Sequence, residues 1–142
     1  MASHAHTLET TAAPDAVWRI WSAPQTWPEW NPDVQSIELD GPFAAGTTGK
    51  MSTKRGGTHD IRLEQVDSGK SFQLETAAIP GARFHFRCEI APLPSGGSRI
   101  SQGISMSGPM AWLFGPMMGP KIAQSFAPIL QSLKAKAEAA AA

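Results

Sequence analysis

The strongest constraint on the fold is a change in the spacing of apolar residues, from every second position in the middle of the chain to a helical spacing near its end. Alternation is clear near residues 60–64, 71–75, 83–90 and 99–106. It is typical of β-strands that bury one face and expose the other. Gly and Pro residues interrupt the alternation about every dozen residues, as turns do in antiparallel hairpins. Residues 34–107 therefore predict an antiparallel sheet covered on one side only.

The helical spacing begins after this sheet. Apolar residues from Ile122 to Ala137 form one stripe, and charged residues lie off it. Gly119-Pro120 suits the start of such a helix, and Pro128 is expected to bend it. The apolar stripe continues backwards through residues 109–118, where a Gly-Pro pair predicts a broken or separate short helix. One long amphipathic helix therefore follows the sheet.

The N-terminal part predicts shorter elements. A strand is expected around Thr7 to Thr11, followed by a helix that Pro14 opens and Pro24 ends. The segment 26–30 is expected to form a single helical turn, since Pro32 cannot continue a helix. Two short helices are thus predicted between the first strand and the main sheet.

Length and charge limit the organisation and the partners. The 142 residues suit one domain, residues 1–142, and 12 basic residues balance 12 acidic ones. This balance argues against a nucleic-acid partner. The most apolar stretch, residues 104–118, is broken by Gly and Pro and too short to span a bilayer. With no signal-peptide pattern at the N-terminus, a cytoplasmic protein without stable membrane insertion is predicted.

Three segments carry a resemblance to a known family. They are Ala13-Pro14-Asp15-Ala16-Val17-Trp18, Trp27-Pro28-Glu29-Trp30-Asn31-Pro32 and Gly97-Ser98-Arg99-Ile100. In their order and spacing the chain resembles the START-like (SRPBCC) superfamily, in particular its polyketide cyclase/dehydrase-type members. The resemblance implies an α+β helix-grip fold: a curved antiparallel sheet of six to seven strands around a long C-terminal helix. It also implies a hydrophobic cavity between sheet and helix, but no single reaction.

The apolar phase of the strands predicts which residues line such a cavity. The inward set is rich in Met and Phe, and Met adapts to ligands of irregular shape. Trp30 and Asn31 lie where the family's cavity is capped. The predicted ligand-binding residues are Trp30, Asn31, Met51, Ile61, Phe72, Leu74, Phe84, Phe86, Gln102, Ile104, Met106, Met110, Phe114, Met117, Met118 and Ile122.

Few candidates for catalysis fall on the inward phase. His59 is the histidine placed for acid–base chemistry, whereas the arginines of the strands fall on the solvent phase. The chain has no Tyr, which removes a common proton donor. Cys88 is expected to be an inert core residue. His4 and His6 share a strand face, but two histidines without a third ligand do not predict a metal site, and no cofactor is predicted.

Three functions remain open at this point. The favoured one is a non-catalytic binder or carrier of a hydrophobic small molecule such as a lipid, a polyketide or another aromatic metabolite. The alternative is a polyketide cyclase or dehydratase in which His59 acts and Gln102 orients a polar substrate group. The third is a protein-binding module, or a homodimer, in which Trp112 and the 108–120 segment form the contact.

Overall fold

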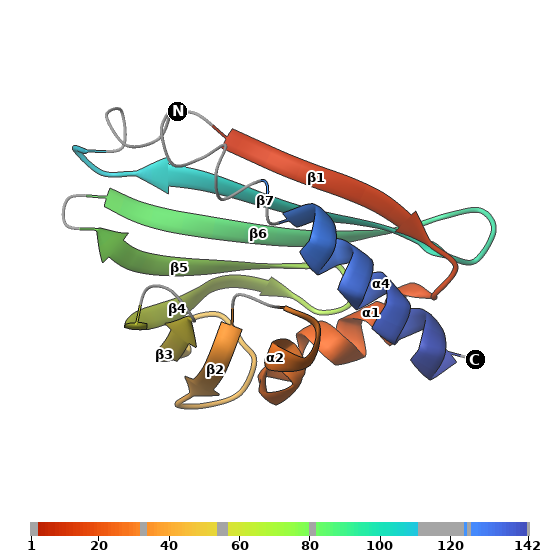
Figure 1. The fold of residues 1–142 in the computed structure, drawn as a ribbon, viewed down its shortest axis with the longest axis horizontal. Helices are drawn as coiled ribbons and strands as arrows, with labels where there is room; N and C mark the ends of the chain where they lie inside the picture. Colours follow the sequence, from red (N-terminus) through yellow and green to blue (C-terminus); the bar gives the residue numbers. More distant parts are fainter. Residues whose placement is uncertain are drawn as a thin grey trace.

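The computed structural model describes residues 3–31, 34–53, 57–79, 82–110, 124 and 126–141. They form one seven-stranded sheet in the order β1-β7-β6-β5-β4-β3-β2, with every neighbouring pair antiparallel (Figure 1). The strands are β1 (Ser3–Thr10), β2 (Val34–Leu39), β3 (Thr48–Thr53), β4 (Gly57–Asp67), β5 (Ser71–Ile79), β6 (Ala82–Pro92) and β7 (Ser98–Ser107). The helical elements are α1 (Pro14–Trp21), the 3-10 turn η1 (Pro24–Thr26), α2 (Trp27–Trp30) and α4 (Phe126–Ala141).

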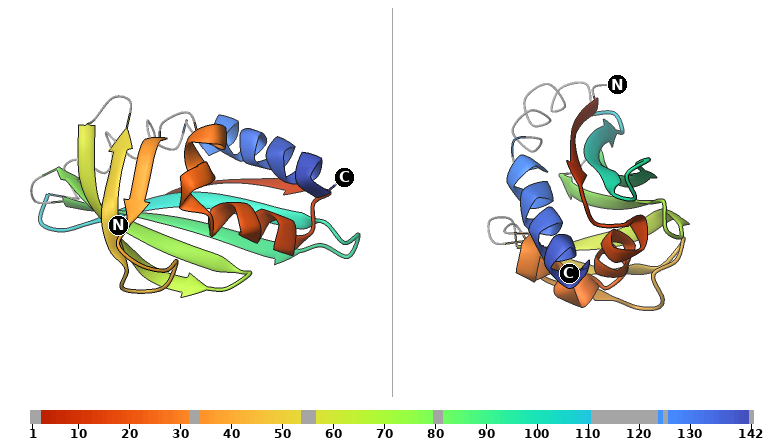
Figure 2. Two further views of the ribbon diagram at one scale, coloured as in Figure 1. Left: turned by 90° about the horizontal axis from the view of Figure 1, so that it is seen from below. Right: turned by 90° about the vertical axis from the view of Figure 1, so that its right-hand side faces the viewer.

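This architecture confirms the predicted fold class. Strands β2 to β7 are joined in sequence order, and the first strand closes the far edge by pairing with the last one, with Leu8 opposite Ile100. The short helices follow β1, as predicted, and the C-terminal helix lies on the same side of the sheet (Figure 2). We call the side that carries the helices the inner face and the opposite side the outer face.

The C-terminal helix covers part of the inner face with one apolar stripe. Its buried residues are Phe126, Ile129, Leu130, Leu133 and Ala137. Two polar contacts fix its position: Lys136 Nζ donates to Glu29 of α2 at 2.6 Å, and Thr10 Oγ1 of β1 donates to Glu138 at 2.7 Å. The helix begins at Phe126, so Pro128 lies in its first turn. The missing N–H there would have no intrahelical partner, which removes the reason for the predicted bend.

Gly97 explains part of the third motif of the family resemblance. A Cβ atom at Gly97 would stand 2.3 Å from the backbone oxygen of Thr10. The next residue, Ser98, is fully buried and donates its hydroxyl to the backbone oxygen of Ala12 at 2.8 Å. The motif therefore holds the start of β7 tightly against the link between β1 and α1.

An aromatic cluster packs where the short helices meet the sheet. Trp18 and Trp21 from α1 and Trp27 from α2 pack against Phe72 of β5, with ring centroids 5.4–6.4 Å apart. Phe43 joins them at 5.2 Å from Phe72. Aromatic pairs of this kind, which are edge-to-face except for the stacked Trp27–Phe72 pair, add about 0.5–1.5 kcal/mol each beyond the area they bury. The cluster fixes α1 and α2 over β5. Within the described residues, no helix is both long and apolar enough to cross a membrane.

Candidate functional site

The strand residues predicted to line the cavity lie on the inner face. Six of them are at most 5% exposed: Ile61, Phe72, Leu74, Phe84, Ile104 and Met106. The ladder register aligns Ile61, Thr76, Phe84 and Met106 in one row across β4, β5, β6 and β7. Met51 and Phe86 are half-buried, and the ring of Phe86 packs against Phe126 of α4 at 6.4 Å. The inner face is thus a continuous apolar surface.

The other predicted lining residues divide into two groups. Trp30 is buried in α2, while Asn31 and Met110 are half-buried. Phe114, Met117, Met118 and Ile122 lie outside the described residues, as do Trp112 and most of the 108–120 segment. The described part of the predicted site is therefore the sheet wall and the α2 cap.

One fully buried polar group on the inner side lacks a partner among the described residues. It is the indole N–H of Trp30, a side chain 5% exposed, which has no hydrogen-bond acceptor there. Gln102 is 8% exposed and faces inward between Cys88 and His6 on the neighbouring strands. Its carboxamide offers a second polar group on this face, but it is not one of the fully buried unpaired groups. An unpaired buried donor or acceptor costs about 1–3 kcal/mol, so such groups call for a ligand or water.

Neighbouring polar groups of the same side are satisfied. Trp27 Nε1 donates to the backbone oxygen of Trp21 at 3.0 Å. Thr76 Oγ1 donates to the backbone oxygen of Asp60 at 3.1 Å. The lack of a partner for the Trp30 indole within the described residues is therefore a local property of that position.

His59 lies on the inward phase of β4 but far from Gln102. It is half-buried and pairs with Met51 near the β3–β4 hairpin. Gln102 is three strands away and about six residues further along the ladder, which amounts to more than about 20 Å along the sheet. The register therefore holds the two side chains at opposite ends of the inner face, too far apart to contact the same small group, and a catalytic role of His59 stays a prediction.

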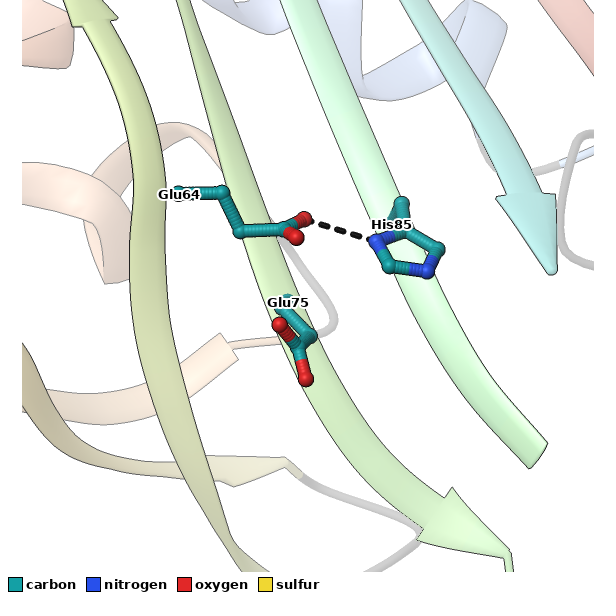
Figure 3. Close-up of side chains that lie close together, drawn as sticks. All are labelled: Glu64, Glu75 and His85. Atoms are coloured by element: carbon teal, nitrogen blue, oxygen red, sulfur yellow. Dashed lines mark hydrogen bonds and ion pairs between the residues drawn. The ribbon is translucent and has the colours of Figure 1, made fainter. Parts of the chain in front are cut away.

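The outer face carries a hydrogen-bonded chain that sequence reasoning missed. His85 Nδ1 lies 2.7 Å from Glu64 Oε1, and His85 Nε2 lies 2.7 Å from Ser107 Oγ (Figure 3 shows the histidine with Glu64). An ionised carboxylate only accepts, so Nδ1 carries the proton and donates to Glu64. In neutral His85, Nε2 then accepts from the Ser107 hydroxyl. The imidazole and the Glu64 carboxylate are 15% and 19% exposed.

Glu75 belongs to the same outer-face network. It is 5% exposed and lies between Arg62, whose Nη2 donates to it at 2.9 Å, and Arg83, whose Nη1 donates to its other oxygen. The hydrogen bond from Arg62 holds the pKa of Glu75 below its usual range, and Arg83 acts in the same direction, against the opposing effect of burial. Glu75 is therefore ionised at neutral pH.

Glu64, Glu75 and His85 also have the composition of a metal site. One potential ligand atom from each lies within 4.8 Å of the others (Figure 3). A cation here would have to compete with the two arginines that already neutralise Glu75. The arrangement favours hydrogen bonding over metal coordination.

The outer-face network could not be predicted from the sequence, because His85 is 21 positions from Glu64 and 22 positions from Ser107 along the chain. Alternation correctly puts Arg62, His85 and Ser107 on the solvent phase, where polar residues are ordinary. One usable signal is that a histidine and a carboxylate stand mid-strand on that phase. Their partnership depends on the register of three strands and on a β-bulge.

Cys88 is buried on the inner face, opposite Phe72 and Gln102. Burial raises the pKa of its thiol, so the nucleophilic thiolate does not form at neutral pH. This placement fits the expected inert core cysteine.

A comparison with protein families shows the family to which the chain belongs. Residues 1–138 match the family described as polyketide cyclase / dehydrase and lipid transport. The chain belongs to this family. A search of curated proteins finds no match to the sequence.

Solved structures confirm the START-like fold. The ZhuI aromatase/cyclase from Streptomyces sp. R1128 is 13% identical with a TM-score of 0.77, covering 96% of this chain and 93% of that one. A START superfamily protein from Mycobacterium smegmatis is 13% identical with a TM-score of 0.73, covering 96% and 97%. Norcoclaurine synthase from Thalictrum flavum, in complex with dopamine and hydroxybenzaldehyde, is 15% identical with a TM-score of 0.71, covering 94% and 84%. At these identities the likeness shows the fold alone.

Proposed function

We propose that this family member is a non-catalytic binder or carrier of a hydrophobic small molecule, such as a lipid, a polyketide or another aromatic metabolite. The ligand occupies the space between the inner face of the sheet and the C-terminal helix. The main support is the buried indole N–H of Trp30, which has no acceptor among the described residues, together with the inward-facing amide of Gln102 on an apolar sheet face. Pockets of this kind are mostly apolar with a few placed polar groups.

The Trp30 indole and the Gln102 carboxamide limit which polar groups the ligand can carry. The indole of Trp30 is a donor only, so its partner must be an acceptor such as a carbonyl or hydroxyl oxygen. The carboxamide of Gln102 both donates and accepts. A mainly apolar molecule with at least one oxygen satisfies the proposal better than a pure hydrocarbon.

Native mass spectrometry of the gently purified protein and displacement of a fluorescent apolar dye test the proposal. Gln102→Met keeps the volume and removes the amide, and should weaken an oxygen-bearing ligand about tenfold. The matched control is Gln65→Met, because Gln65 is exposed on the outer face and should leave the dissociation constant unchanged.

Binding of no apolar molecule by the parent protein would overturn the proposal. Turnover of a polyketide substrate that His59→Ala abolishes would replace it with the cyclase or dehydratase alternative. Loss of self-association in Trp112→Ser, measured by sedimentation, would instead support the contact through residues 108–120.

A further inference from the structure

We propose that Ser107, His85 and Glu64 form a nucleophile, base and carboxylate relay on the outer face that can accept an acyl group from a small ester. The relay lies on the side of the sheet opposite the proposed ligand-binding surface. The relay is therefore a second site, and its test is independent of the ligand binding proposed for the inner face.

The geometry is that of an activated serine. The base lies 2.7 Å from the Ser107 oxygen, and the carboxylate lies 2.7 Å from the other ring nitrogen. Nucleophilic serines need a base within hydrogen-bond reach and a third group that orients the base. The required tautomer, with the proton on Nδ1, is the one that Glu64 imposes. Ser107 is half-buried at the end of β7, so its oxygen is not sealed in the core.

Strand alternation sets the direction of the carboxylate. Arg62 and Glu64 alternate with the buried Ile61 and Leu63, so Glu64 points to the outer face. The register of β4 and β5 shifts between Leu63 and Gln65, so Glu64 lies in a β-bulge and Gln65 also points to the outer face. Gln73 Nε2 then donates to Glu64 Oε1 at 3.0 Å, on the same oxygen that His85 uses. Glu64 and Gln73 are therefore positioning residues, and His85 and Ser107 would touch the substrate.

Arg83 is the cation next to the nucleophile. It stands directly opposite Ser107 in the β6–β7 ladder, and its side chain is 61% exposed. Glu75 accepts from one of its nitrogens, and a guanidinium carries five N–H donors. Its guanidinium is held on the β5 side of β6 by Glu75, so Arg83 would have to turn towards β7 to stabilise the negative charge that develops on a carbonyl oxygen attacked by Ser107.

The proposed reaction has two balanced halves. Ser107 Oγ attacks the ester carbonyl, its proton passes to His85 Nε2, and the bond from the carbonyl carbon to the leaving alcohol breaks. The alcohol departs with the proton from His85, leaving an acyl ester on Ser107. Water, deprotonated by His85, then attacks this ester, and the products are the free acid and the original serine.

The test uses the full chain with an alkyl fluorophosphonate and, separately, p-nitrophenyl acetate. We expect one adduct, mapped by peptide mass spectrometry to Ser107 and absent from Ser107→Ala. His85→Gln should slow labelling by at least about 100-fold. Ser101→Ala is the matched control, because Ser101 lies on the same face of β7 but its hydroxyl pairs with Thr7 at 3.0 Å. Its labelling should equal that of the parent.

Glu64→Gln separates a relay from a merely structural network. A glutamine amide can donate to Nδ1, which moves the ring proton to Nε2 and removes the acceptor for Ser107. Labelling should fall about tenfold or more at an unchanged melting temperature, and Glu64→Asp should restore part of it. Absence of an adduct on Ser107, or labelling that His85→Gln leaves unchanged, would overturn the proposal.

Discussion

The inner and outer faces of β4 to β7 carry different chemistry, although their residues alternate along the same four strands. On the inner side, large apolar side chains lie beside the indole N–H of Trp30 in α2, which has no partner among the described residues, and beside the inward-facing amide of Gln102 in β7. On the outer face, carboxylates, arginines and a histidine satisfy one another in a continuous network. A buried polar group without a partner beside an apolar surface thus favours a ligand, whereas a fully hydrogen-bonded network near solvent favours preorganised chemistry.

The variant with the largest expected effect tests whether the inner face supplies most of the free energy of unfolding. Leu63 is fully buried, and Leu63→Ala should lower the free energy of unfolding by about 2–5 kcal/mol. Gln65→Ala, two residues away on the exposed side, should change it by no more than about 0.5 kcal/mol. Urea unfolding of both variants measures the difference. Similar losses at the two positions would contradict the assignment of the faces.

A medium effect tests whether the outer face also stabilises the fold. Glu75→Gln removes the acceptor of two arginines and should cost on the order of 1–2 kcal/mol at pH 7. Because the pKa of Glu75 is lower in the folded protein than in the unfolded chain, this stabilisation is present above about pH 4.3 and is lost as the pH falls through the folded value.

Thermal unfolding of the parent and of Glu75→Gln between pH 7 and pH 2 checks this sign. The gap between the two melting temperatures should be widest at neutral pH and close in acid. Glu89→Gln is the control, since the Glu89 carboxylate pairs with Arg87 in solvent and should contribute no more than about 0.5 kcal/mol. A gap that persists in acid would show that Glu75 acts through packing rather than charge.

The smallest expected effect sharpens the contrast between satisfied and unsatisfied groups. Trp30→Phe removes an N–H that has no partner among the described residues, so the loss of volume is partly offset and stability should change by about 1 kcal/mol or less. Trp27→Phe leaves the Trp21 carbonyl without its donor and should cost more, about 1–3 kcal/mol. Calorimetry compares them, and the reverse order would remove the argument for a ligand acceptor at Trp30.

Much of the fold could be predicted from local pattern. The alternation around Ile61, Leu74 and Ile104 identified strands and their buried side, because side-chain direction in a strand reverses at every residue. The wall of the proposed pocket followed from the same rule. The long-range arrangement did not: nothing local separates His59 from Gln102, since both lie on the inward phase and only the sheet order places them at opposite ends.

The sequence by itself determined the elements, the apolar face and the family to which this chain belongs, since each depends on residues near one another along the chain. Tertiary structure alone decided that Ser107 meets His85 and that His85 meets Glu64. The reason is physical: contacts between strands depend on their register, and the one-residue bulge after Leu63 turns Gln65 to the same face as Glu64. Packing likewise left the Trp30 indole N–H without an acceptor among the described residues, whereas the Trp27 indole donates to the backbone oxygen of Trp21.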